Sequence, residues 1–316
     1  MSLLQISHLH KSFAGVKAVN DISITLEKGK ILAILGESGS GKTTLLHLIA
    51  ALYEPDEGTL TLAGERITPP SEKLIAGHPD IKLVRQDYGL FPNISIRENI
   101  AYELRYYVED YRNERVDKLL QISGLEHVQH HLPRQVSGGE QQRAVIARAI
   151  AEEPKLLLMD EPFSHLDAVN KRRLKEEVLN LIKAEGVSCI FVTHDVADAY
   201  GMADVLMIMQ RGSMLQIGNP EEVYKNPANQ YVAEITGEIN PILPFLHKEI
   251  SNVSIKFIRP EQIYFKPDSD LRATVENIRF LGAYYEIILK NPQSLLKMYS
   301  FEKFNIGEDI GIEIKV

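Results

Sequence analysis

Gly36-Glu37-Ser38-Gly39-Ser40-Gly41-Lys42-Thr43 is the stretch of sequence that decides the fold. It follows a short apolar run at residues 31–35 and precedes a helix-forming run that starts at Thr44. A loop that wraps backbone N–H groups around phosphate oxygens needs glycines, because side chains would block that approach. The helix after the loop would direct its positive end at the same phosphates. The stretch therefore predicts a phosphate-binding loop between a strand and a helix.

The residue types in this loop indicate a nucleoside triphosphate as ligand. Lys42 would neutralise the β- and γ-phosphates, and Thr43 would hold Mg²⁺. The alternative is a chance glycine-rich turn, but the spacing is more specific than a bare GxGxxG and stands in the required context. We expect ATP to contact the whole loop, namely Gly36, Glu37, Ser38, Gly39, Ser40, Gly41, Lys42, Thr43 and Thr44.

Composition and charge restrict the classes of protein that remain. A chain of 316 residues, 44% hydrophobic and 25% charged, is typical of a soluble globular protein and long enough for two domains. Its net charge of −8 makes nucleic acid a poor partner, since such binding depends on neutralising phosphates. Cys189, the single cysteine, excludes an intrachain disulfide and is expected in the core.

The order of the apolar segments predicts an α/β fold. Continuous apolar runs at 31–35, 155–159 and 188–193 alternate with helix-like segments at 103–123, 140–151 and 170–184. Such runs are typical of parallel strands buried on both faces by helices. Beyond Gly237 the chain changes to short alternating segments separated by prolines, which favours a small all-β domain. We therefore expect one domain over residues 1–237 and a second over 241–316.

Two carboxylates follow one of the apolar runs. Asp160 and Glu161 stand directly after residues 156–159, so both would lie at an edge of the sheet. There Asp160 could bind Mg²⁺ and Glu161 could polarise an attacking water. Taken alone, the pair would favour ordinary solvated acids at a strand end, and only the phosphate-binding loop makes that the minor interpretation.

The segment Ser137-Gly138-Gly139-Glu140-Gln141-Gln142-Arg143 carries a second signal. Ser137 and Glu140 have the spacing of a capping box at a helix start. Paired glycines at such a start also free the backbone to approach a phosphate. Standing between the two nucleotide motifs, this segment resembles the signature of the ATP-binding-cassette ATPases. The resemblance implies a P-loop NTPase core with a helical subdomain at about 87–150.

Further positions match the same family. Gln86 matches the glutamine loop, residues 164–167 match the loop across the dimer interface, and His194 matches the switch histidine. Phe13 stands where the family stacks an aromatic ring on adenine. The resemblance implies a head-to-tail homodimer, or a pair with a related cassette, in which Ser137, Gly138, Gly139 and Glu140 of one chain cover ATP bound to the other. It assigns catalysis to Lys42, Gln86, Glu161 and His194, with Glu161 as base, and Mg²⁺ to Thr43, Gln86 and Asp160.

Two regions resemble importer ATPases in particular. Residues 89–100 are similar to the segment that receives a helix from a membrane permease subunit, and residues 257–263 and 280–282 resemble a C-terminal OB-type regulatory domain. The resemblance implies a peripheral protein on the cytoplasmic face of the inner membrane. Its partners would be permease subunits and, indirectly, a solute-binding protein. The implied solute is a small ion or polyamine, such as ferric iron or an oxyanion, with sugars not excluded.

Two other classes remain open at this point. One is a soluble ATPase of the same superfamily that acts on a ribosome or a nucleic-acid complex, although the chain lacks a second cassette or a coiled-coil insertion. The other is a non-catalytic nucleotide sensor, which the presence of Lys42, Asp160, Glu161 and His194 disfavours. No apolar run approaches the roughly 18 residues that cross a bilayer, so any membrane part would belong to a partner.

Overall fold

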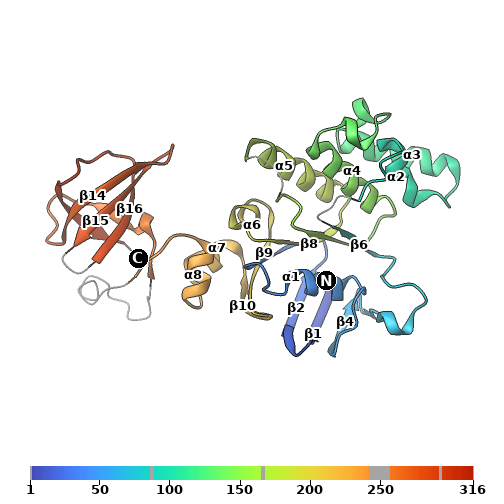
Figure 1. Cartoon of the computed structure of the whole chain (residues 1–316), viewed down its shortest axis with the longest axis horizontal. Helices are drawn as coiled ribbons and strands as arrows, with labels where there is room; N and C mark the ends of the chain where they lie inside the picture. Colours follow the sequence, from blue (N-terminus) through green and yellow to red (C-terminus); the bar gives the residue numbers. More distant parts are fainter. Residues whose placement is uncertain (1, 86–88, 165–167, 242–256, 292–293, 316) are drawn as a thin grey trace. The chain divides into compact units, whose positions relative to one another are not determined.

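The computed structural model describes residues 2–85, 89–164, 168–241, 257–291 and 294–315 (Figure 1). The chain divides into two compact units, Met1–Val223 and Tyr224–Val316. This division falls earlier than residue 237, and the extent of the nucleotide-binding domain to that residue stays a prediction.

A six-stranded sheet forms the centre of the larger unit. Its strand order is β10-β9-β3-β8-β7-β6, with β10 antiparallel to β9 and the other neighbours parallel. β3, β7 and β8 form where continuous apolar runs predict buried parallel strands, which confirms the α/β class. The strands are β3 (Ile31–Leu35), β6 (Ile81–Val84), β7 (Leu156–Asp160), β8 (Ser188–Thr193), β9 (Val205–Gln210) and β10 (Ser213–Gly218).

A second, antiparallel sheet covers helix α1 (Lys42–Ile49) from its other side. Apolar residues of α1 share one core with both sheets, among them Leu45 and Leu46 of the helix, Leu4 of β1 and Ile190 of β8. Figure 1 shows this sheet below the six-stranded sheet, with α1 beside it. Its order is β2-β1-β4-β5, over β1 (Ser2–Phe13), β2 (Val16–Glu27), β4 (Glu57–Leu62) and β5 (Glu65–Arg66).

Helices gather on the opposite side of the six-stranded sheet (Figure 1). The predicted helix at 103–123 is wrong in its first part, because α3 begins only at Glu109. Val108 is extended there, and Glu109 and Asp110 supply the negative charge that favours a helix N-terminus. Besides α1, this unit has α2 (Ile96–Ala101), α3 (Glu109–Ile122), α4 (Gly138–Ile150), α5 (Ala168–Ala184) and α6 (Val196–Met202), with short 3-10 turns at Pro70–Glu72, Tyr102–Leu104, Glu126–Val128 and Pro133–Gln135. Helix α7 (Pro220–Lys225) follows β10.

The smaller unit is built on a five-stranded antiparallel sheet of order β13-β17-β14-β15-β16, which confirms the predicted β-rich domain. Inward residues such as Ile287, Leu289 and Met298 form its own core. The guanidinium of buried Arg259, which follows β12, donates to backbone carbonyls of Ala233 and Tyr224 and joins helix α8 to the chain after β12 within this unit. The elements are α8 (Gln230–Thr236), β11 (Asn240–Pro241), β12 (Phe257–Ile258), a 3-10 turn (Pro260–Gln262), β13 (Ile263–Phe265), β14 (Arg272–Phe280), β15 (Tyr285–Asn291), β16 (Ser294–Ser300) and β17 (Asp309–Ile314).

Candidate functional site

Strand pairing brings three of the predicted motifs to one edge of the larger sheet. Strand β8 lies between β3 and β7, and the pairs Leu35–Thr193 and Val192–Asp160 are in register. The phosphate-binding loop follows β3, His194 follows β8, and Asp160 ends β7. The carboxyl ends of parallel strands are where α/β sheets place ligand sites.

The glycines of the loop are required by the close approach of other backbone. Gly41 has a φ of +101°, and a Cβ there would lie 2.0 Å from the carbonyl oxygen of Ala18. A Cβ on Gly36 would lie 2.4 Å from the carbonyl oxygen of Met209. Gly39, with a φ of +79°, has no atom within 4 Å of such a Cβ. The loop is thus packed from behind and open at Gly39, as a phosphate cradle needs.

Lys42 is buried beneath this loop. Its Nζ donates to the carbonyl oxygens of Gly36 at 2.8 Å and Glu37 at 2.9 Å, and to Oγ of Ser40 at 3.4 Å. Burial lowers the pKa of Lys42 and outweighs the opposing effect of nearby carboxylates. Because all three acceptors are uncharged, an anionic phosphate would be a better partner for the ammonium.

Thr43 and Asp160 lie in contact although they are far apart in sequence. Oγ1 of Thr43 donates to Oδ1 of Asp160 at 3.2 Å. Burial raises the pKa of Asp160 and outweighs the opposing hydrogen bond from Thr43. A hydroxyl and a carboxylate are the oxygen ligands that Mg²⁺ takes in proteins, so these two residues fit the metal predicted from the sequence.

Glu161 has a backbone conformation that non-glycine residues rarely adopt, with a φ of +46°. Its N–H donates to the carbonyl oxygen of Val192 at 3.2 Å, and its carboxylate Oε2 lies 3.2 Å from Nδ1 of His194. Such strained residues cluster at functional sites, where surrounding structure holds them in place. The two residues that the sequence assigns to catalysis after β7 and β8 therefore lie together.

The signature segment forms the start of α4 as predicted. Ser137 caps the helix, because its Oγ accepts from the N–H of Glu140 at 3.3 Å. The N–H of Ser137 donates to Oε2 of Glu140 at 2.7 Å, which completes the capping box. A Cβ on Gly139 would meet no atom within 4 Å, so the helix start is open. Sequence reasoning missed His127, whose Nε2 lies 3.0 Å from Oε1 of Glu140. The printed sequence gives no signal for that contact, because His127 belongs to a separate turn.

Of the three remaining predicted positions, the structure describes only Phe13. Phe13 is 44% exposed, and its ring packs edge-on against Tyr53 with centroids 5.7 Å apart. Tyr53 in turn contacts His47 of α1, the helix that follows the phosphate-binding loop. Gln86 and residues 165–167 lie outside the described residues.

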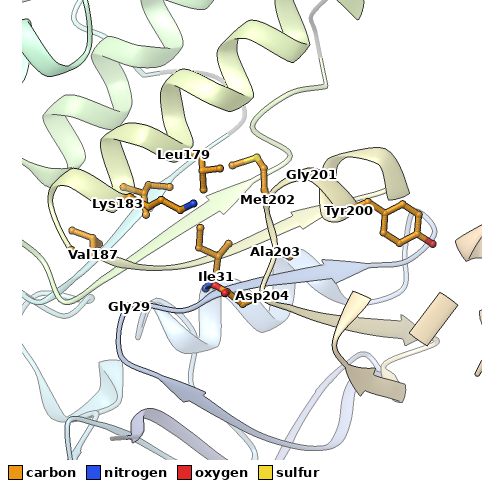
Figure 2. Close-up of a pocket in the computed structure, with 12 residues that line it drawn as sticks. Gly29, Ile31, Leu179, Lys183, Val187, Tyr200, Gly201, Met202, Ala203 and Asp204 are labelled. Carbon is orange, nitrogen blue, oxygen red and sulfur yellow. Dashed lines mark hydrogen bonds between the residues drawn. The ribbon is translucent and has the colours of Figure 1, made fainter. Parts of the chain in front are cut away.

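A cavity of about 420 Å³ lies at the amino ends of the strands, away from the phosphate-binding loop (Figure 2). Ile31 at the start of β3 and Leu179 and Lys183 of α5 line it. The Asp204 carboxylate at its base accepts hydrogen bonds from Nζ of Lys30 at 3.1 Å and from the N–H of Ile31 at 2.9 Å. This cavity is separate from the site formed by the motifs.

The fold and these contacts define a P-loop nucleotide-binding protein. The family model for ABC transporters matches residues 19–164, and the model for the TOBE domain matches residues 257–314. In the residues that the structure describes, no helix is both long and apolar enough to span a membrane.

Several relatives and solved structures are similar to the chain. The spermidine/putrescine import ATP-binding protein PotA of Bacteroides thetaiotaomicron is 32% identical, over 99% of this chain and 72% of that protein. The Fe(3+) ions import ATP-binding protein FbpC 2 of Pectobacterium atrosepticum is 33% identical, over 99% and 97%. The structure of cbiO1 from Clostridium perfringens, part of the ABC transporter complex cbiONQ, has a TM-score of 0.67 at 27% identity, over 72% and 92%. A dimeric, ADP- and phosphate-bound structure of the ATP-binding cassette MJ0796 has a TM-score of 0.59 at 26% identity, over 69% and 98%.

The chain belongs to the ABC transporter family and is an ATPase of the importer type with a C-terminal TOBE domain. The resemblance found in the sequence is thereby confirmed for the family, the fold class and the enzyme class.

Proposed function

We propose that this chain hydrolyses ATP as a homodimer and couples hydrolysis to solute uptake through membrane permease subunits. The observation that carries the proposal is the convergence of buried Lys42, the Thr43–Asp160 contact and the Glu161–His194 contact at one edge of the sheet. A nucleotide sensor without turnover would not need a carboxylate held beside the histidine.

Each of these residues has a role that its surroundings support. Lys42 neutralises the β- and γ-phosphates, Glu161 accepts a proton from the attacking water, and His194 holds the γ-phosphate near Glu161. Thr43 and Asp160, with Gln86 assigned from the sequence, would hold Mg²⁺, which when bound would supply further neutralisation of phosphate charge. Positioning and charge neutralisation account for most of the catalysis of phosphoryl transfer.

The signature segment serves the second half of a composite site. The start of α4 presents Ser137, Gly138 and Gly139, with space above Gly139 and the positive end of a 13-residue helix behind them. We assign these residues and Glu140 to ATP bound by a partner copy. The dimeric cassette among the similar structures supports this assignment.

An aromatic patch supports docking to a permease. Phe91 and Tyr102 are each 38% exposed, and their ring centroids are 4.4 Å apart. The buried Asn99 side chain accepts from the N–H of Phe91 at 2.7 Å and donates to its carbonyl oxygen at 3.1 Å, which fixes this loop on α2. Arg148 of α4 lies 5.3 Å from the Phe91 ring. The two rings would pack against apolar residues of a permease helix, and the arginine would contact polar groups at the end of that helix.

The solute is proposed from the relatives, whose names specify polyamines, ferric iron and sulfate. We place this chain at the cytoplasmic face of the membrane, where a solute-binding protein would act on it only through the permease. The TOBE domain is assigned a regulatory role. Selection of a small ion or polyamine would then belong to the partner subunits.

Co-purification of the full chain with membrane proteins tests this proposal. The double variant Phe91→Ala/Tyr102→Ala should lose the permease while ATP binding by the chain is unchanged. Phe301→Ala, an equally aromatic change at an 87% exposed position of the smaller unit, should retain it. Co-sedimentation with ribosomes, or a permease retained by the double variant, would count against an importer docked at this patch.

A further inference from the structure

Lys171 lies in the first turn of α5 and bridges two carboxylates that follow the switch histidine. Its Nζ is 2.6 Å from Oδ2 of Asp195 and 2.9 Å from Oδ1 of Asp198. The Asp198 side chain is only 4% exposed, and that of Lys171 is 18% exposed. The Asp195 side chain is 41% exposed, so the contact with Asp198 is the better shielded of the two, and shielded, charge-assisted contacts are stronger than surface ion pairs.

The bridge fixes the backbone on both sides of His194. Oγ1 of Thr193, the residue before it, donates to Oδ2 of Asp198 at 3.0 Å. The N–H of Asp195, the residue after it, donates to Oγ1 of Thr193 at 3.0 Å. Since Lys171 contacts both aspartates, the turn that carries His194 is attached to α5 at two points.

The bridge also lies next to the reacting groups. A small cavity of about 60 Å³ is lined by Glu161, His194 and Lys171 together. Nδ1 of His194 lies 3.2 Å from Oε2 of Glu161, and Nζ of Lys171 lies 2.6 Å from Oδ2 of Asp195, the residue after His194. A shift of this turn by an ångström would therefore change the distance between His194 and Glu161, and misplacements of that size slow catalysis.

We propose that Lys171 is a positioning residue that holds His194 against Glu161 by way of Asp195. The inference rests on the proposed roles of His194 and Glu161 in hydrolysis. Lys175 does not duplicate this function, because its Nζ reaches Asp198 at 3.3 Å and the carbonyl oxygen of Ala197 at 2.8 Å. Among the residues that the structure describes, Lys171 is the one ammonium in ion-pair contact with Asp195.

Steady-state ATP hydrolysis by the full chain, with Mg²⁺ in excess, tests the inference. Lys171→Met should lower kcat about tenfold, the effect of roughly 1.4 kcal/mol in the barrier, while the KM for ATP changes less than about twofold. Lys171→Arg should recover most of the lost kcat, because a cation remains to bridge the aspartates. Arg172→Met removes the same charge from the next, exposed residue and should leave kcat unchanged.

A second variant separates loss of positioning from loss of folding. Asp195 caps α6 by accepting from the N–H of Ala197 at 2.9 Å, and asparagine is an equally good cap. Asp195→Asn should therefore keep the helix and the melting temperature but weaken the contact to Lys171. We expect it to reproduce the fall in kcat seen with Lys171→Met.

The His194→Ala background separates this inference from the proposed function. If Lys171 acts through His194, Lys171→Met should cause no further loss of turnover in that background. An equal loss in both backgrounds, or a change confined to KM, would overturn the positioning role. Unchanged turnover in His194→Ala itself would instead refute the proposed role of the histidine.

Discussion

Nδ1 of His194 lies 3.2 Å from Oε2 of Glu161, across the ends of two adjacent parallel strands. This contact joins two segments that are distant in sequence, because His194 follows β8 and Glu161 follows β7. The contact depends on the strand register and on the left-handed backbone of Glu161. A carboxylate held in this position beside an imidazole is suited to accept a proton from a water at the γ-phosphate.

Glu161→Gln should keep ATP binding and lower turnover by a factor of about 10² to 10⁴, the usual contribution of a general base. ATP should then hold the variant as a dimer, detected by size-exclusion chromatography with and without nucleotide. Glu176→Gln, at an exposed position of α5, is the matched control and should behave as the unmodified chain. Turnover that is unchanged in Glu161→Gln would remove the residue from the role of base.

Phe13→Ala should weaken ATP binding about tenfold, because stacking of a base on an aromatic ring contributes about 1–3 kcal/mol. Its exposed ring, held by Tyr53, is available for that contact. Inorganic triphosphate has no base, so calorimetry should find its affinity unaltered. Val16→Ala changes the 70% exposed strand partner of Phe13 and serves as control. Equal weakening for ATP and triphosphate would exclude stacking on adenine.

Glu185→Gln should lower the free energy of unfolding by about 3 kcal/mol, because it leaves a buried arginine without its carboxylate. The Glu185 side chain is 5% exposed, and its carboxylate lies 2.6 Å from the 4% exposed side chain of Arg115 and 2.9 Å from Lys118. Glu153→Gln is the matched control, since Glu153 is 63% exposed and 3.8 Å from the same arginine. Urea denaturation of the three proteins checks the difference, and equal stability of both variants would contradict it.

The contacts of Glu185 with Arg115 and Lys118 also make the stability of the folded chain depend on pH. Burial by itself would raise the pKa of Glu185, but hydrogen bonds from Lys118 and Arg115 outweigh it, so the pKa in the folded state is lowered. The stabilisation is therefore complete above the ordinary value of 4.5 and is lost as pH falls through the lower folded-state pKa. Below that pH the unmodified chain and Glu185→Gln should converge in stability.

The sequence predicted most of the elements that form the candidate nucleotide-binding edge, because their signals are local. Continuous apolar runs mark β3, β7 and β8, and the loop from Gly36 to Thr43 has a spacing with few other uses. The capping box of Ser137 and Glu140 was equally visible, since its members are only three positions apart in the sequence.

What the sequence did not predict depends on contacts between distant segments. Strands β1 and β2 were missed because polar residues such as His8 and Asp21, both at positive φ, interrupt their alternation at register shifts. Lys171 precedes Arg172 and Arg173, which are exposed on the same helix. From the sequence alone, Lys171 was therefore indistinguishable from an ordinary solvent-exposed lysine. Only the folded chain places Asp195 and Asp198 against it.

The in-register pairing of β7 with β8 also determines where this chain can change length. One residue inserted between 156 and 160 would turn alternate side chains to the opposite face and move the carboxylate of Glu161 away from His194. An insertion at the Gly186 turn, before β8 begins, would leave that distance intact, because the strand is paired from Ser188 onward. Insertions and deletions among relatives should therefore concentrate at the amino ends of the strands, while the positions at the proposed ATP-binding edge stay in register.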